Sequence, residues 1–500
     1  MHALRLSQFV LMILLWITPT AVAKPNPKVG ASSVVITEAV RLGQPERADW
    51  EVVDDLRVTA LYVEFQGTSV CLLSYDLCEI TRDEVHLLKD TIARELKIER
   101  DGIHIFCTHN HSSSGVGGHD MDFLKAKSRQ VAVMARESAV ETPEIDFLRV
   151  DTGREYNINR RTRHGMLGTW CLMQSRGCKD DGNRVEGTEW ILQKMMDYGA
   201  TSEEVATITG PFVADRKNDP FLDLVLFRKT DSGYAGGLVR FTAHPVICSA
   251  GYWRRNIGRD YPGVLCDHLS RQFDCPILFL QGPCGDHRSR HRKVGLEERD
   301  RIAKGLANAL IAPFGSAGKF RFDSVKNTVM HVSCALRADF PSSIQDAQIQ
   351  IAHLRQRLAS LKQGQDSLKE RKDLAERIAF YRNAIDVLEG LPYVLPGEVA
   401  KKSADFDISH IEFGDIHLLN FPGELFSTVC SGLQTAARGP VVVTSFADGV
   451  SGYLLPIEDF KQGGYEWTWA LFRPESMVTM RRAALRILNK NGKKDHISVP

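Results

Sequence analysis

Apolar and polar residues alternate along two neighbouring segments near the start of the chain. The segments together span residues 56–75, lie on either side of Gln66-Gly67-Thr68 and end at Asp76. Alternation with a period of two, interrupted by a glycine-containing turn, is typical of two antiparallel strands. The pattern therefore predicts a β-hairpin.

A helix is predicted directly after this hairpin. Thr81 and Glu84 fit a capping box, because the threonine hydroxyl and the glutamate carboxylate each satisfy a backbone amide that the first turn leaves free. Apolar residues then recur on one face of the predicted helix, at Val85, Leu88, Ile92 and Leu96.

One further arrangement recurs along the chain: a short apolar strand, a turn, and then one or two polar residues. Such strands are predicted at residues 103–107, 238–243, 277–280, 417–421 and 441–446. The polar residues that follow them are His109 and His111, His244, Asp286, Glu424 and Tyr453. Loops at strand ends bring distant residues together on a rigid base, so we expect these side chains to share one cleft.

Between residues 344 and 388 the composition shifts to charged helix-forming residues, with apolar residues at helical spacing in two stretches. Gly364 lies between the stretches and is a natural turn. We therefore predict a helical hairpin insertion over residues 342–390, packed on the body of the protein, although an arm that binds a partner is the alternative. With the strands above, the expected fold class is α/β (mixed α+β), in which mixed β-sheets are flanked by helices.

The first residues are typical of an export signal. Arg5 is followed by an apolar run over residues 9–17, Pro19 interrupts it, and Ala21-Val22-Ala23 offers a cleavage site. The run is shorter than the ~20 residues that span a bilayer, and no later segment is apolar enough to do so. We expect a signal peptide over residues 1–23, a single domain over residues 24–500, and a secreted or periplasmic protein.

Charge and cysteine content narrow the choice of function and compartment. The formal net charge is +1, which removes any general electrostatic case for nucleic-acid binding. The 11 cysteines are odd in number. Export allows disulfides, and Cys171 with Cys178 is the most plausible local pair, whereas most other cysteines lie in apolar runs typical of a core.

The histidine pair is the strongest chemical signal. In an extended segment the rings of His109 and His111 point to the same side, a spacing that suits a metal and a second polar group. Taken singly, His244 fits a core histidine, Glu424 an acidic residue near a helix start, and Tyr453 a packed aromatic residue. As a set, histidines, one carboxylate and one phenol form a shell that suits Zn²⁺ with an open position for water. No helical His-Glu-x-x-His, Gly-x-Ser-x-Gly or phosphate-binding loop competes with this interpretation.

Six motifs in order resemble the neutral/alkaline (non-lysosomal) ceramidase family. Thr108-His109-Asn110-His111-Ser112 is similar to its Thr-His-Thr-His-Ser motif, and 158–160 resembles its Ile-Asn-Arg segment. The other matching segments are 241–245 with the second histidine, Gly285-Asp286, Pro422-Gly423-Glu424, and the closing tyrosines Tyr453 and Tyr465.

The resemblance implies a zinc ion held by His109, His244, Glu424 and Tyr453, and hydrolysis of a linear, lipid-like amide such as N-acylsphingosine. It places His111, Arg160 and Tyr465 at the substrate. His111 would bind the substrate or assist proton transfer, and Arg160 and Tyr465 would stabilise the developing oxyanion. Asp286 is expected to orient a nearby ligand or loop rather than to bind the metal.

The chain also departs from the family pattern. Arg288 stands where the family has a serine, and the chain ends soon after the last predicted helix, 477–488, without the β-sandwich of well-known members. Arg288, Arg290, His291 and Arg292 would suit an anionic head group, or form a solvated basic loop. Two alternatives stay open: a zinc hydrolase of the same architecture that acts on a different, anionic amide or ester, and a non-catalytic secreted binding protein.

Overall fold

The computed structural model describes residues 25–489, except 116, 173–188, 215, 250–254, 365–366 and 392. The predicted signal peptide and Cys178, the predicted partner of Cys171, lie outside the described residues. No disulfide joins two described cysteines.

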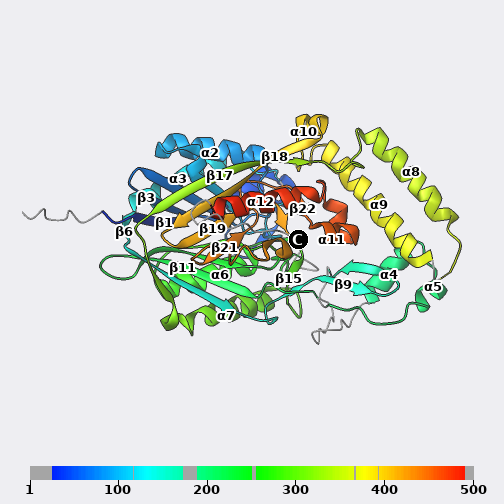
Figure 1. Ribbon diagram of the computed structural model, residues 1–500, viewed down its shortest axis with the longest axis horizontal. Helices are drawn as coiled ribbons and strands as arrows, with labels where there is room; N and C mark the ends of the chain where they lie inside the picture. The colour runs from blue at the N-terminus through cyan, green and yellow to red at the C-terminus, as the bar shows by residue number, and fades with distance from the viewer. Residues whose placement is uncertain are drawn as a thin grey trace, which may run out of the picture.

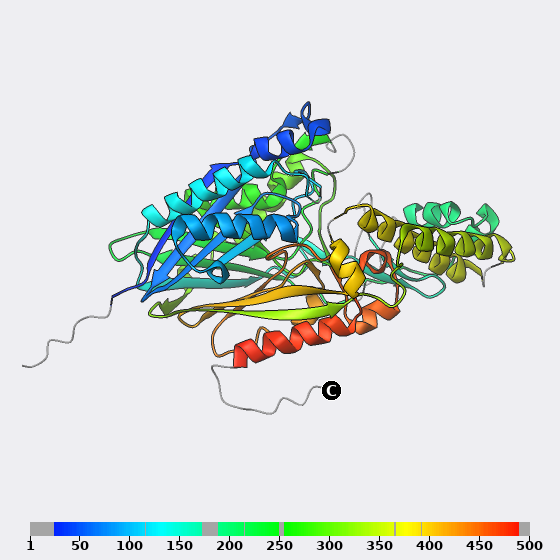
Figure 2. The same ribbon diagram turned by 90° about the horizontal axis from the view of Figure 1, so that it is seen from above.

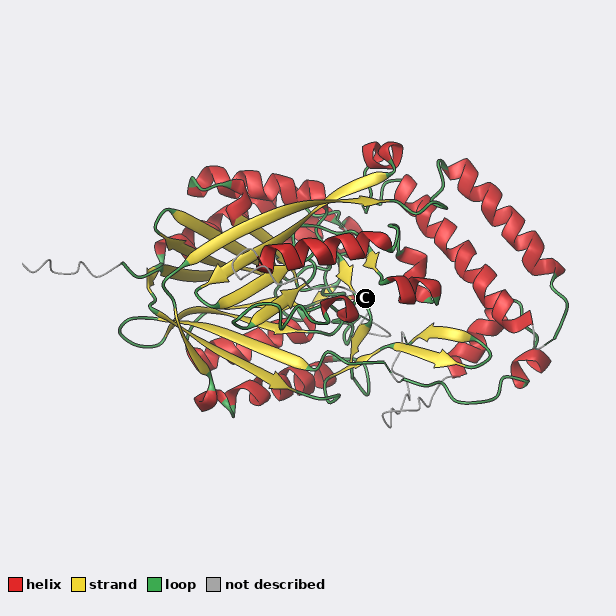
Figure 3. Cartoon of the chain, viewed as in Figure 1, coloured by secondary structure: helices red, strands yellow, loops and turns green. Residues whose placement is uncertain are grey.

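Three β-sheets form the body of the protein (Figure 3). In each sheet the strands are antiparallel except for one parallel pair at an edge. In spatial order, the first sheet is β5 (Ile103–Cys107), β4 (Thr68–Tyr75), β3 (Arg57–Phe65), β1 (Lys28–Val35) and β6 (Val140–Glu141). The second is β14 (Ile277–Gln281), β12 (Tyr234–Phe241), β11 (Phe221–Arg228), β7 (Glu144–Asp151) and β16 (Gly318–Arg321). The third is β17 (Val325–Ala335), β18 (Ser403–Phe413), β19 (Ile416–Asn420) and β21 (Val441–Thr444).

The predicted hairpin and the helix after it are confirmed. Gln66 and Gly67 both have positive φ, 47° and 84°, in the two-residue turn that joins β3 to β4. Helix α2 (Arg82–Leu96) begins with the expected capping box, in which Thr81 and Glu84 bind each other's backbone amides. The four apolar residues of its predicted face are buried.

The three sheets share one apolar core. Side chains from all of them meet in a single buried cluster that includes Val63, Phe227, Leu280, Phe413 and Val442. The opposite face of the first sheet is covered by α2 and α3 (Met121–Glu137), and that of the second by α6 (Asp260–Phe273) and α7 (Leu296–Ile311). Figure 2 shows α12 (Glu475–Asn489, red) along the third sheet, on the far side of the molecule from α2 and α3. Strands buried on both faces in this way hold their ends in fixed positions.

The helical hairpin is formed by α8 (Ile344–Ser360) and α9 (Ser367–Leu388), which lie at one end of the molecule (Figure 1). Helix α9 packs on the 3₁₀ helix η6 (Tyr465–Trp469), where Asn383 donates to the Thr468 carbonyl at 2.9 Å. The observed fold is therefore the expected mixed α/β class with a helical hairpin. No described helix has the length and apolar character that crossing a membrane requires.

Candidate metal centre

The end of β5 places His109 in the interior. Strand β5 ends at Cys107, and the chain turns at His109, where φ is 58°. The buried His109 ring stacks on Phe446, with 3.9 Å between ring centres. Its Nδ1 donates to the Cys78 carbonyl oxygen at 3.2 Å. That bond fixes the tautomer and leaves Nε2 facing the Glu424 carboxylate.

His244 follows β12 and is held in the same manner. Its Nδ1 donates to the His287 carbonyl oxygen at 2.8 Å, and its Nε2 lies 3.0 Å from Oε2 of Glu424. Nε2 of His109 lies 3.7 Å from the same carboxylate oxygen. One oxygen therefore faces two imidazole nitrogens whose other nitrogens are occupied by backbone carbonyls.

Glu424 reaches this point through a turn that only glycine fits well. Gly423 has φ 62°, and a Cβ there would overlap the Ser451 hydroxyl. Glu424 begins β20 (Glu424–Leu425), which pairs with β22 (Tyr453–Leu454) so that Glu424 is directly opposite Tyr453. The donor atoms of His109, His244 and Glu424 all lie within 4.8 Å of one another, and all three residues are buried.

The charge state of the histidines suits a cation. Burial, followed by neighbouring His111, lowers the pKa of His109 well below its ordinary value. Burial and Arg160 do the same to the pKa of His244. Neutral imidazoles beside a carboxylate are the form in which these groups bind a metal.

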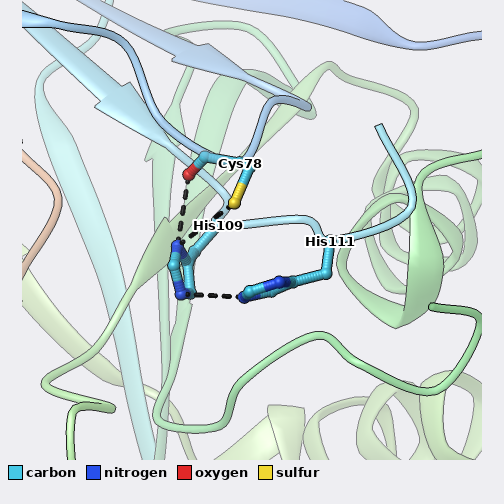
Figure 4. Close-up of side chains that lie close together, drawn as sticks. All are labelled: Cys78, His109 and His111. Atoms are coloured by element: carbon cyan, nitrogen blue, oxygen red, sulfur yellow. Dashed lines mark hydrogen bonds between the residues drawn. The ribbon is translucent and has the colours of Figure 1, made fainter. Parts of the chain in front are cut away.

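Cys78, His109 and His111 make a second group of the same kind, drawn in Figure 4, where the His109 ring lies between the other two side chains. His111 is the exposed member, and its Nε2 lies 3.1 Å from Nε2 of His109. Burial, with Glu79 and Glu424 nearby, raises the pKa of Cys78 well above its ordinary value. The group with His244 and Glu424 is wholly buried and includes a carboxylate, so it is the better metal site.

Tyr453 and Arg160 adjoin the cluster. Arg160 follows β8 (Asn157–Asn159), and its guanidinium donates to the Tyr453 hydroxyl at 2.8 Å and to the Gly285 carbonyl oxygen at 2.9 Å. Burial raises the pKa of Tyr453 well above its ordinary value, although Arg160 opposes that shift. Tyr453 thus lies beside Glu424, and its hydroxyl accepts a hydrogen bond from the Arg160 guanidinium.

Glu466 is a buried residue at this site whose role the sequence did not predict. Its carboxylate accepts from Nε of Arg160 at 3.0 Å and from Arg161 at 2.7 Å. It balances two buried guanidinium groups and fixes the direction of Arg160. In the sequence, Glu466 is distinguished only as an acidic residue between the aromatic residues Tyr465 and Trp467.

Tyr465 lies edge-on to Tyr453, with 6.0 Å between ring centres. Asp286 is not in the metal-capable cluster. Its carboxylate accepts from His287 Nδ1 at 2.9 Å, from Asn159 at 2.7 Å and from the Ser427 amide at 2.9 Å. Since the His287 carbonyl holds His244, Asp286 positions the loop behind a candidate ligand.

The arginine-rich turn is partly buried behind the candidate ligands: Arg288 and His291 are buried, whereas Arg292 is exposed. Arg288 is buried in β15 (His287–Ser289), and its backbone forms a bridge with that of His244. Burial and Arg288 lower the pKa of His291 to about 3, so His291 is neutral near neutral pH. For Arg288 and His291 the alternative of a solvated basic loop is wrong, because β15 pairs with β8 in the interior and both side chains are buried.

No family model matches this chain, and no curated protein matches it in sequence. Among solved structures, the neutral ceramidase from Pseudomonas aeruginosa is similar, with a TM-score of 0.60 and 14% identity over 95% of this chain and 76% of that one. A ceramidase complexed with C2 matches with a TM-score of 0.60 and 13% identity, over 95% of this chain and 77% of its own. The chain therefore has the fold of these ceramidases.

Proposed function

We propose that this protein is an exported zinc-dependent hydrolase that cleaves the linear amide bond of a lipid-like N-acyl substrate, as a ceramidase does. One observation carries the proposal. His109 and His244 each donate Nδ1 to a backbone carbonyl and present Nε2 to the same buried oxygen of Glu424. Histidine ligands of metals are typically held in this way.

The donor chemistry fits zinc. His109, His244 and Glu424 supply two nitrogens and one oxygen, and Tyr453, opposite Glu424 in the strand pair, is the fourth proposed ligand. When bound, zinc supplies Lewis-acid chemistry, which lowers the pKa of a water molecule towards ~7 and polarises an amide carbonyl.

The remaining residues orient the substrate and carry charge. Although burial opposes its charge, interactions with Cys171, Tyr453 and Glu466 raise the pKa of Arg160 well above its ordinary value. Arg160 therefore stays cationic beside the site and stabilises a developing oxyanion, with Tyr465 as a second donor. His111, which is exposed, binds the substrate or takes a proton from the attacking water and gives it to the nitrogen of the leaving amine.

The decisive experiment measures metal content and amide hydrolysis on the same preparation of mature protein. We expect one zinc per chain, and turnover of a fluorogenic N-acyl sphingosine that stops on chelation and returns with zinc. His109→Ala should lose both zinc and turnover, whereas His331→Ala, a control at an exposed histidine of β17, should keep both. A protein that contains no zinc would contradict the proposal.

Zinc without turnover of this substrate would retain the metal centre and assign the chain to another amide or ester, or to a binding role. The same preparation tests export: the mature N-terminus is expected at Lys24, after removal of residues 1–23.

A further inference from the structure

A cavity of about 560 Å³ lies where the helical hairpin meets the body. It is bounded by β10 (Gly168–Cys171), α4 (Glu189–Asp197), α8, α9 and η6, elements that gather at the same end of the molecule in Figure 1. Its volume is in the range of small-molecule pockets. The aromatic side chains that line it are Trp170, Trp190, Tyr198, Tyr465 and Trp469.

The cavity adjoins the candidate metal centre. Tyr465 lines it and lies against the proposed ligand Tyr453. Cys171 also lines it, and the next residue, Leu172, donates its backbone amide to the Arg160 carbonyl oxygen at 2.8 Å. A substrate whose amide lies beside Arg160 has this aromatic space within reach.

The acidic residues of the cavity are already bound to partners. Glu376 of α9 accepts from the Gly464 amide at 3.0 Å and pairs with Lys372 at 2.6 Å, so it fixes the segment that carries Tyr465. Asp197 lies 3.7 Å from Lys194. Neither carboxylate is left to repel an anion at the rim.

Three exposed cations line the cavity, and Arg355 and Arg382 are the two without an acidic partner among the described residues. Arg355 of α8 and Arg382 of α9 both line the cavity, and no carboxylate of the described chain lies within ion-pair distance of either. Arg382 is six residues beyond Glu376 on α9, which corresponds to roughly 9 Å along the helix axis. Arg382 is thus displaced along α9 from Glu376, the residue that holds the segment of Tyr465.

We propose that this cavity selects an amphiphilic substrate whose apolar chain packs on the aromatic wall and whose anionic group, a carboxylate or phosphate, is attracted by the exposed Arg355 and Arg382. This inference refines the proposed function, because it names the class of N-acyl amide that the same centre hydrolyses. Guanidinium groups suit both anions.

Binding tests the cavity independently of catalysis. Three tryptophans line the cavity, so tryptophan fluorescence reports the binding of a probe. The four probes share a ten-carbon chain and are used below the concentration at which they aggregate: decanoate, decyl phosphate, decanol and decyltrimethylammonium. We expect both anions to bind at least about fivefold more tightly than decanol, and the cation to bind most weakly. A preference for one anion over the other identifies the natural head group, and equal affinities for all four probes would overturn the proposal.

The variants assign the preference to the rim. Arg382→Gln and Arg355→Gln should each weaken anion binding about two- to fivefold and leave decanol unchanged. Arg382→Glu should weaken it further. The matched control is Arg377→Gln, at an exposed arginine of α9 outside the cavity lining. Ala379→Phe, which fills the cavity, should weaken all four probes.

A carboxylate could also bind the metal, and His109→Ala separates the two sites. Anion binding that persists in His109→Ala and falls in Arg382→Glu supports the rim, whereas the reverse pattern would refute it. Hydrolysis of matched N-acyl amides with and without a terminal carboxylate completes the test. If no amide is cleaved but the rim effects stand, the proposed function fails and the binding site survives.

Discussion

Asp286 is an ionised carboxylate in the interior, and its charge contributes to stability. Although burial alone would raise it, interaction with His287 and hydrogen bonds from His287 and Ser427 lower the pKa of Asp286 from 3.8 to about 2. A carboxyl group with a lowered pKa in the folded state stabilises the protein above its unfolded pKa and loses that contribution as pH falls through the folded value.

The predicted consequence is a pH-dependent effect of Asp286→Asn. At pH 7 we expect the variant to lower the free energy of unfolding by about 2.5 kcal/mol, because the shift is slightly under two pKa units and each unit corresponds to about 1.4 kcal/mol. The difference from the parent protein should shrink as pH falls from about 4 towards 2, measured by urea unfolding at several pH values. A difference that stayed constant over this window would show that the charge is not its source.

Arg160 is predicted to act on the reaction rather than on metal binding. Arg160→Lys keeps the positive charge but loses the planar set of donors that reaches Tyr453, Gly285 and Glu466 together. We expect kcat to fall about 10²-fold while zinc content is retained. Arg149→Lys, at the Asp223 ion pair of the second sheet, is the control and should leave kcat unchanged; an equal loss in both variants would point to a general effect on folding.

At the scale of elements, strand ends explain which parts of the site were predictable. His109 and His244 follow β5 and β12, so the apolar runs that predict those strands also locate the two histidines. The strand predicted at 441–446 instead ends at Thr444, because Phe446 and Asp448 have positive φ and the chain turns to stack Phe446 on His109. Neither that stacking nor the pairing of Glu466 with Arg160, 306 residues away in sequence, has a local signal.

The helical hairpin is joined to the candidate metal centre through the segment that follows α9. Tyr393 donates to Glu79 at 3.0 Å, and Glu79 lies 3.9 Å from Nδ1 of His109. All three residues are buried. The segment after the hairpin therefore supports a proposed ligand, whereas the hairpin itself forms a wall of the cavity.

Tyr393→Phe should accordingly reduce both stability and zinc affinity. It leaves a buried carboxyl oxygen of Glu79 without its donor, which costs roughly 1–3 kcal/mol. Thermal unfolding and a competitive zinc titration measure the two effects. Tyr62→Phe removes a similar tyrosine–glutamate bond, to Glu64, remote from the site and only partly buried, so it should change zinc affinity little. Equal zinc affinity in the two variants would show that the Tyr393–Glu79 hydrogen bond does not support the candidate metal centre.

Across the whole molecule, three of the four candidate ligands lie just beyond strands of three different sheets. His109 follows β5 of the first sheet, His244 follows β12 of the second, and Glu424 follows β19 of the third. A metal held by all three therefore connects the sheets at the end where their shared core stops. Binding to the folded state alone raises stability by mass action, by about 4 kcal/mol at a free concentration 1,000 times Kd.

We therefore expect zinc to raise the midpoint of thermal unfolding of the parent protein. His109→Ala, His244→Ala and Glu424→Gln should each abolish this increase, because each removes the connection to one sheet. His111→Ala and Cys78→Ser should preserve most of the increase, since the second metal-capable group shares only His109 with the first. The opposite pattern, in which zinc stabilisation depends on Cys78 and His111 but not on His244 or Glu424, would place the metal in that second group and leave the three sheets unconnected by it.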